Sequence, residues 1–105
     1  MDPKFKEKFH KDAKKFLKKM ATIHLGLSKG EFDLRTNLAG PASLGETTLH
    51  TDHVYVQMGG LQQDILIRSC KGRKDYTGGR NHFKHVLDTE DEIATLVKRC
   101  AGSYI

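Results

Sequence analysis

The segment from Arg68 to His85 carries the side chains whose types best suit anion binding. It holds six basic residues against one acidic residue, and its three glycines allow backbone N–H groups to approach an anion closely. Arginine can bind phosphate oxygens in bidentate fashion, and interleaved aromatic rings can stack on bases. The basic glycine-rich loop expected at residues 71–85 is therefore predicted to bind nucleic acid or a nucleotide-like ligand. The predicted ligand-binding residues are Arg68, Lys71, Arg73, Lys74, Tyr76, Arg80, His82 and Lys84.

The same segment also permits a small ribonuclease that needs no metal. In that interpretation His82 or His85 is the acid or base, and Arg73 and Arg80 hold the phosphate. Tyr76 would stack on a base or donate a proton. The residue types are present, but their spacing is not diagnostic, because basic binding loops contain the same types without catalysis. The TGGR stretch also lacks the spacing of a phosphate-binding P-loop. The sequence therefore favours a non-enzymatic protein without a cofactor.

A third hypothesis is a protein-interaction or inhibitor protein, of the kind that phages and mobile elements use to block a host complex. Its partner would be an acidic protein surface, or a complex that handles nucleic acid. This hypothesis rests on the small size of the chain and on the lack of a catalytic signature. It predicts tight binding to such a protein and no affinity for RNA alone.

Histidine and cysteine invite a metal-site interpretation. The sequence contains two H-x-x-H pairs, at His50 and His53 and at His82 and His85. Residues three apart on a strand point to opposite faces, and the chain has neither C-x-x-C nor H-E-x-x-H, so no metal site is predicted. The two cysteines are Cys70 and Cys100, which we expect to be buried thiols.

The net charge of +5 is concentrated in two places. Residues 1–20 contain eight lysines against three acidic residues, and residues 68–85 form the second basic segment. A localised positive field attracts phosphates and acidic surfaces. The lysine-rich segment is expected to be the solvated side of a helix, and the sequence does not show whether the two basic segments share one face.

Apolar periodicity predicts a helix at each end of the chain. The first begins at Asp2 and Pro3, continues to about Leu25, and has an apolar face of Phe5, Phe9, Ala13, Phe16, Leu17 and Met20. The last follows Thr89, which forms a capping box with Glu92. Its apolar side is predicted to be Ile93, Leu96, Val97 and Cys100.

Four strands are predicted between the helices, at residues 31–37, 46–50, 53–58 and 61–70, with a reversal at Gly59 and Gly60. His53, Tyr55 and Gln57 share one strand face, which could form a floor beneath the basic loop. The fold class is α+β, with one domain over residues 1–105 in the order α-β-β-β-β-α. An antiparallel meander is packed by the N-terminal and C-terminal helices. No apolar stretch is long enough for a membrane span and no export signal is visible, so a cytoplasmic protein is expected.

Overall fold

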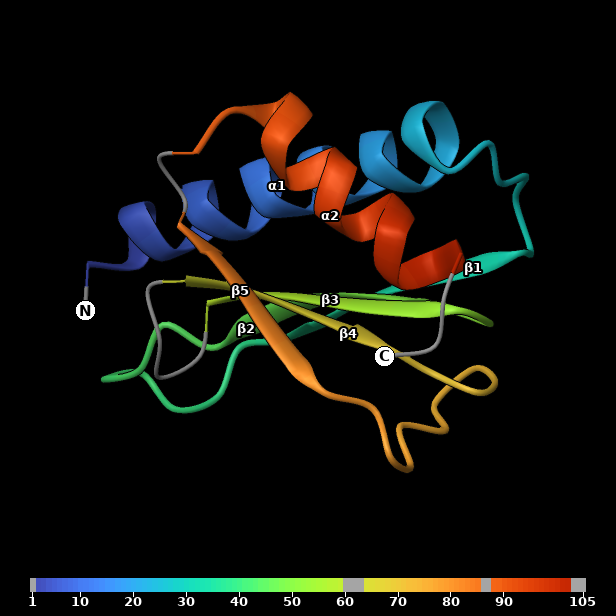
Figure 1. Ribbon diagram of the computed structural model, residues 1–105. Coiled ribbons are helices and arrows are strands. Elements are labelled where there is room, and N and C mark those ends of the chain that lie inside the picture. The colour runs from blue at the N-terminus through green and yellow to red at the C-terminus, as the bar shows by residue number, and fades with distance from the viewer. Residues whose placement is uncertain (1, 60–63, 86–87, 103–105) are drawn as a thin grey trace.

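The computed structural model describes residues 2–59, 64–85 and 88–102. Five antiparallel strands form one sheet in the order β1-β2-β3-β4-β5, so each strand pairs with its neighbours in sequence. The strands are β1 (Phe32–Asn37), β2 (Glu46–Thr51), β3 (Val54–Gly59), β4 (Asp64–Ser69) and β5 (Asn81–His85). The helices α1 (Pro3–Lys19) and α2 (Glu90–Gly102) lie on one side of the sheet, and none of the described residues forms a helix on its other side (Figure 1). The predicted α+β meander between two terminal helices is therefore confirmed.

The predicted number of strands is wrong, because the expected loop at residues 71–85 ends in a strand. β5 pairs with β4 in the register Leu66↔Phe83, and the connecting loop covers residues 70–80. β5 is an edge strand whose only large apolar side chain is Phe83, so it lacks the apolar alternation that identifies a strand in a sequence. The predicted reversal at Gly60 falls outside the described residues.

The first helix begins and ends as its sequence predicts. Asp2 caps it by accepting a hydrogen bond from the backbone N–H of Lys4 at 2.9 Å, and Pro3 occupies the first turn. The α-helix ends at Lys19 and continues as a π-helical turn, η1 (Met20–His24), before Gly26 adopts a φ of +67°. Only the predicted position of Phe5 differs, since that side chain is 56% exposed at the first turn.

The hydrophobic core lies between the two helices and the side of the sheet that faces them. Leu17 of α1, Leu49, Val56 and Ile67 of the central strands, and Val97 of α2 are all fully buried there. The backbone N–H of Glu92 donates to Thr89 Oγ1 at 3.2 Å, which is half of the predicted capping box. Cys70 and Cys100 are buried free thiols, and burial raises the pKa of both.

A buried histidine fastens α1 to the sheet. His10 Nε2 lies 2.6 Å from the carbonyl oxygen of Leu44, and His10 Nδ1 lies 2.8 Å from Thr47 Oγ1. Because a carbonyl can only accept, His10 Nε2 carries a proton and donates it to the oxygen of Leu44. The imidazole thus satisfies one polar group of β2 and one of the loop before it.

We expect His10→Ala to lower the free energy of unfolding by about 2 kcal/mol, because it leaves Thr47 and Leu44 without their buried partner. Urea unfolding followed by circular dichroism measures the change. Glu7→Ala, on an exposed position of the same helix, is the control and should stay within about 0.5 kcal/mol of the parent. Equal effects of the two substitutions would show that His10 does not hold the helix.

Candidate functional site

The side of the sheet without helices presents three rows of side chains. The register between the strands aligns these side chains in rows. They lie on this side of the sheet because they alternate with the core residues of each strand, which point toward the helices. The row nearest the 70–80 loop is Asp33, His50, Tyr55, Arg68 and Asn81. The middle row is Arg35, Thr48, Gln57, Leu66 and Phe83, and the far row holds Asn37, Glu46, Gly59, Asp64 and His85. We call this surface the open face.

The 70–80 loop folds back onto the open face through Tyr76. Its hydroxyl lies 2.7 Å from His50 Nδ1, and its ring packs edge-on against Tyr55 with centroids 4.8 Å apart. Arg68 Nη2 donates to the backbone oxygen of Tyr76 at 2.6 Å. A Cβ on Gly79 would lie 2.4 Å from the backbone oxygen of Ser69, so only glycine fits where the loop returns to the sheet. The strand face of Tyr55 is thus beneath the basic loop.

His50 is the centre of a hydrogen-bond chain under this loop. The hydroxyl of Thr48 donates to the backbone oxygen of Arg35 at 3.5 Å, so it accepts from His50 Nε2 at 2.9 Å. His50 Nδ1 is then left to accept from the hydroxyl of Tyr76. This order requires a neutral imidazole. Burial lowers the pKa of His50, and the nearby cations Arg35 and Lys74 lower it further, so the ring stays neutral at pH 7.

This chain predicts a pH dependence of folding. Because the pKa of His50 is lower in the folded protein than in the unfolded chain, its contribution to stability is complete above the unfolded value of 6.5 and is lost as the pH falls below it. We expect the parent protein to lose more stability between pH 7.5 and 5.5 than His50→Gln does, as measured by urea unfolding at both values. Equal losses would show that His50 titrates alike in both states. Both proteins contain the same other titratable groups, so the difference between their losses of stability reports the titration of His50 alone.

Tyr55 lies beside His50 and, like it, stays uncharged. Its hydroxyl donates to Gln57 Oε1 at 2.7 Å, and its ring centroid lies 5.3 Å from that of His50. Burial raises the pKa of Tyr55, and Glu46 and Tyr76 raise it further. The two tyrosines and His50 therefore form an uncharged aromatic cluster inside a charged surface.

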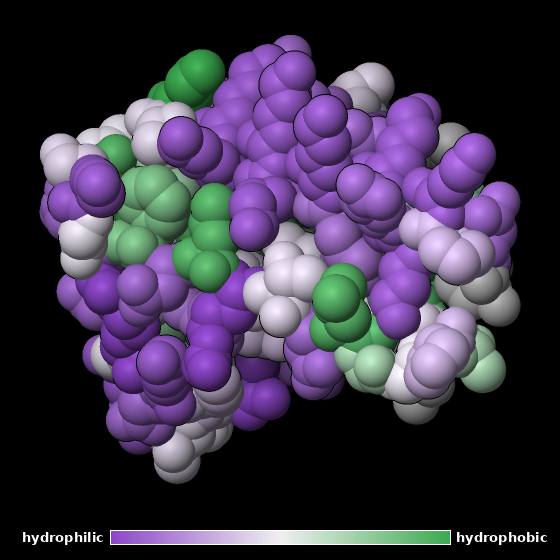
Figure 2. Space-filling model, turned by 180° about the vertical axis from the view of Figure 1, so that it is seen from behind, coloured by the Kyte–Doolittle hydropathy of each residue, from purple (hydrophilic) through white to green (hydrophobic). Residues whose placement is uncertain are grey.

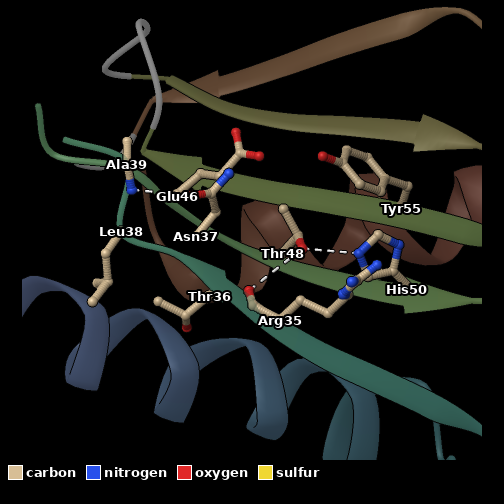
Figure 3. Close-up of a pocket in the computed structure, with 9 residues that line it drawn as sticks. All are labelled: Arg35, Thr36, Asn37, Leu38, Ala39, Glu46, Thr48, His50 and Tyr55. Atoms are coloured by element: carbon tan, nitrogen blue, oxygen red, sulfur yellow. Dashed lines mark hydrogen bonds between the residues drawn. The ribbon is translucent and has the colours of Figure 1, made fainter.

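A cleft of about 740 Å³ opens beside this cluster, toward the β1 edge of the sheet (Figure 3). This volume falls in the range of small-molecule sites. Arg35 and Glu46 give the cleft one charge of each sign, and His50 and Tyr55 close it on the loop side. Its lining residues are Arg35, Thr36, Asn37, Leu38, Ala39, Glu46, Thr48, His50 and Tyr55.

The predicted ligand-binding arginines have different surroundings. Arg73 lies 3.3 Å from the carboxylates of both Asp33 and Asp52, and it donates to the backbone oxygen of Gly30 at 3.2 Å. Its guanidinium therefore fastens the loop to the sheet. Arg68 is also engaged, with Tyr76. Arg80, in contrast, is exposed just before β5.

Lysines 71 and 74 are exposed in the loop, and Lys74 has an unusual backbone conformation. Its φ of +68° lies in the left-handed region, at the third position of a turn in which Asp75 N–H donates to the backbone oxygen of Gly72 at 2.9 Å. Glycine or asparagine normally occupies such a position, because a side chain there strains the backbone. A lysine at this position costs stability, and such strain often accompanies a functional role.

Two of the predicted residues lie apart from the others. His82 is opposite Ile67 and Lys84 is opposite Ile65, so both point to the helix side of β5. His85 points to the open face, so the two histidines predicted as candidates for the acid or base of a ribonuclease lie on opposite sides of the strand. Phe83 lies on the open face and is 45% exposed.

The two basic segments occupy opposite sides of the sheet. α1 lies with α2 on the helix side, whereas the 70–80 loop lies on the open face at the other side of the molecule (Figure 1). Seen from behind, hydrophilic side chains gather over α1 and again over the region of the loop, with patches of white and green, hydrophobic side chains between them (Figure 2). The segments therefore present two separate positive surfaces.

Sequence reasoning did not select Arg35, Thr48 or His50 as members of a binding site. Strand alternation predicts which face of its own strand each residue occupies. The three side chains meet only because of the register between β1 and β2, which residues 38–45 connect. No local sequence pattern encodes that register. Among the described residues, no group of three His, Cys, Asp or Glu side chains could hold a metal ion. In the same part of the chain, no helix has the length and apolarity to cross a membrane.

The chain was also compared with known proteins. Models of protein families, curated protein sequences and solved structures all gave no match, so its function must be inferred from its own residues.

Proposed function

We propose that this protein binds single-stranded nucleic acid, or a nucleotide, on its open face and does not cleave it. The observation that carries this proposal is the position of the half-exposed Phe83 and the Tyr55–Tyr76 pair on the same face as Arg35 and the Lys74 turn. Aromatic rings on a sheet surface stack on unpaired bases, and flanking cations bind the phosphates. The site therefore includes the predicted loop but extends over the sheet.

The distribution of charge gives the ligand an orientation. Arg68, Lys74 and Arg80 lie at the loop end of the open face, whereas Glu46 and Asp64 lie in the far row. A phosphate backbone would be attracted to the loop end and repelled from the far end. We infer that the phosphates follow the loop and that the bases extend toward the middle row, where Phe83 lies.

The arrangement of the histidines supports binding rather than cleavage. General acid–base catalysis needs two titratable groups within reach of the same reacting phosphate. His82 and His85 point to opposite sides of β5, and His50 is only 8% exposed, with both ring nitrogens engaged. The residues on the open face can hold a phosphodiester, but they offer no accessible acid–base pair of histidines.

Fluorescence anisotropy with labelled 20-nucleotide oligo(dT) and oligo(U), at about 50 and about 200 mM salt, tests this proposal. The expected result is affinity that falls steeply as salt rises, because phosphate binding releases counterions. Gel analysis of the same samples should show intact oligonucleotide. Labelled duplex DNA is the control ligand, and it should bind more weakly than the single-stranded oligonucleotides because its bases are not available for stacking.

Two results would contradict the proposal. If neither oligo(dT) nor oligo(U) binds at low salt, nucleic acid is not the ligand. The appearance of shortened oligonucleotide would replace the binding function with a ribonuclease, and His82→Ala and His85→Ala would then identify its catalytic residues.

A further inference from the structure

β1 has one edge that no other strand covers among the residues that the structure describes. The sheet order is β1-β2-β3-β4-β5, so among the described residues β1 pairs along only one side. Its last three residues, Arg35, Thr36 and Asn37, are exposed. Alternate residues of such an edge direct their N–H and C=O groups outward, and these groups can pair with another extended chain.

A row of lysines from α1 borders this edge. Lys11, Lys14, Lys15 and Lys18 line a groove of about 480 Å³ together with His10 and with Thr36 of β1. Among the described residues, the side-chain ammonium groups of these four lysines form no hydrogen bond and no ion pair. The groove thus combines an unpaired backbone with unneutralised positive charge.

We propose that the β1 edge binds an extended acidic segment of a partner protein as a sixth strand. In such a strand, alternate side chains point to the helix side, where they meet the α1 lysines, and the others point to the open face, near Arg35. The preferred segment therefore carries Asp or Glu at every second position. Main-chain pairing supplies affinity and the alternate side chains supply specificity.

The charge of the groove argues against two other occupants. A second copy of this chain, paired edge to edge, would bring two rows of lysines together, and each copy has a net charge of +5. Nucleic acid would satisfy the lysines, but a phosphodiester has no N–H and C=O groups in strand geometry to pair with the edge. An acidic peptide satisfies both features.

Fluorescence anisotropy with a labelled ten-residue peptide of alternating Glu and Val tests the proposal. Two further peptides of the same sequence carry N-methyl groups, one on all Glu amides and the other on all Val amides. The N–H groups of successive residues point to opposite edges of a strand, so either the Glu set or the Val set faces β1 and the other set faces solvent. We expect the unmodified peptide to bind at about 50 mM salt and only one methylated peptide to lose at least about tenfold in affinity.

The protein offers a matched pair of variants for the same measurement. The triple variant Lys11→Gln, Lys15→Gln and Lys18→Gln removes three charges from the groove, and it should weaken peptide binding at least about tenfold. The control variant Lys4→Gln, Lys29→Gln and Lys98→Gln removes three charges from exposed positions elsewhere and should bind the peptide nearly as the parent does. Binding of oligo(U) should be the same in both variants, because α1 lies on the other side of the sheet from the open face.

Three outcomes would overturn the proposal. The first is the lack of peptide binding at low salt. The second is equal binding of all three peptides, which would show attraction by charge without strand pairing. The third is an equal loss in both triple variants, which would place the acidic peptide away from the groove. None of these outcomes bears on the open face, so the two proposals can fail separately.

Discussion

Phe83→Leu is expected to weaken binding of oligo(U) about 5- to 150-fold while leaving the fold intact. An aromatic platform contributes about 1–3 kcal/mol per stacked base, and leucine keeps the apolar character without the flat ring. Phe83 is 45% exposed on the edge strand β5, so it contributes little to the core. Anisotropy at fixed salt measures the affinity, and the urea midpoint measures stability.

Phe83→Tyr provides the matched control, because it keeps the ring and should bind close to the parent value. Lys84→Gln changes the adjacent residue on the other side of the same strand and should reduce affinity only slightly. If Phe83→Leu binds as well as Phe83→Tyr, then no base stacks at this position. In that case the phosphate contacts of the loop would have to account for all of the affinity.

Replacing Lys74 with glycine is expected to change stability and binding in opposite directions. Glycine adopts the observed φ of +68° without strain, so we expect the free energy of unfolding to rise by about 1 kcal/mol. The same substitution removes a cation that lies close enough to His50 to lower its pKa. If Lys74 contacts one phosphate, the slope of log affinity against log salt should become shallower by about 0.7.

Lys74→Arg separates the two effects, because it keeps the charge together with the strained backbone. It should retain both the salt dependence and the stability of the parent protein. An unchanged salt slope in Lys74→Gly would show that no phosphate binds at the turn. A drop in the stability of Lys74→Gly would show instead that the lysine side chain holds the loop in place.

The sequence predicts the helices and most strands of this fold because their signals are local. Asp2 and Thr89 mark helix starts, apolar alternation marks β1 and β3, and a short apolar run marks β4. β5 is missed because its side chains are polar except for Phe83, and because its extended conformation depends on pairing with β4. Such a strand is recognised from its hydrogen-bonded pairing with the neighbouring strand and not from the types of its own residues.

The candidate site is predicted only in part, for a related reason. The types of residue in the 70–80 loop suggest anion binding. Composition alone, however, cannot separate the exposed Arg80 from Arg73, which forms ion pairs with Asp33 of β1 and with Asp52 in the β2–β3 turn. The cleft formed by Arg35, Thr48 and His50 depends on the register between β1 and β2. A shift of one residue would turn these side chains to the opposite face.

In a sheet with helices on only one side, successive residues of a strand alternate between packing in the core and forming the exposed surface. Along β3, Val54 and Val56 are completely buried under the helices, whereas Tyr55 and Gln57 face the other way. Substitutions at the first set compete with the packing of the whole domain, but substitutions at the second set change mainly what the surface recognises. Within a lineage, the open face can therefore acquire a new specificity through single replacements at every second position, while the hydrophobic layer beneath it stays constant.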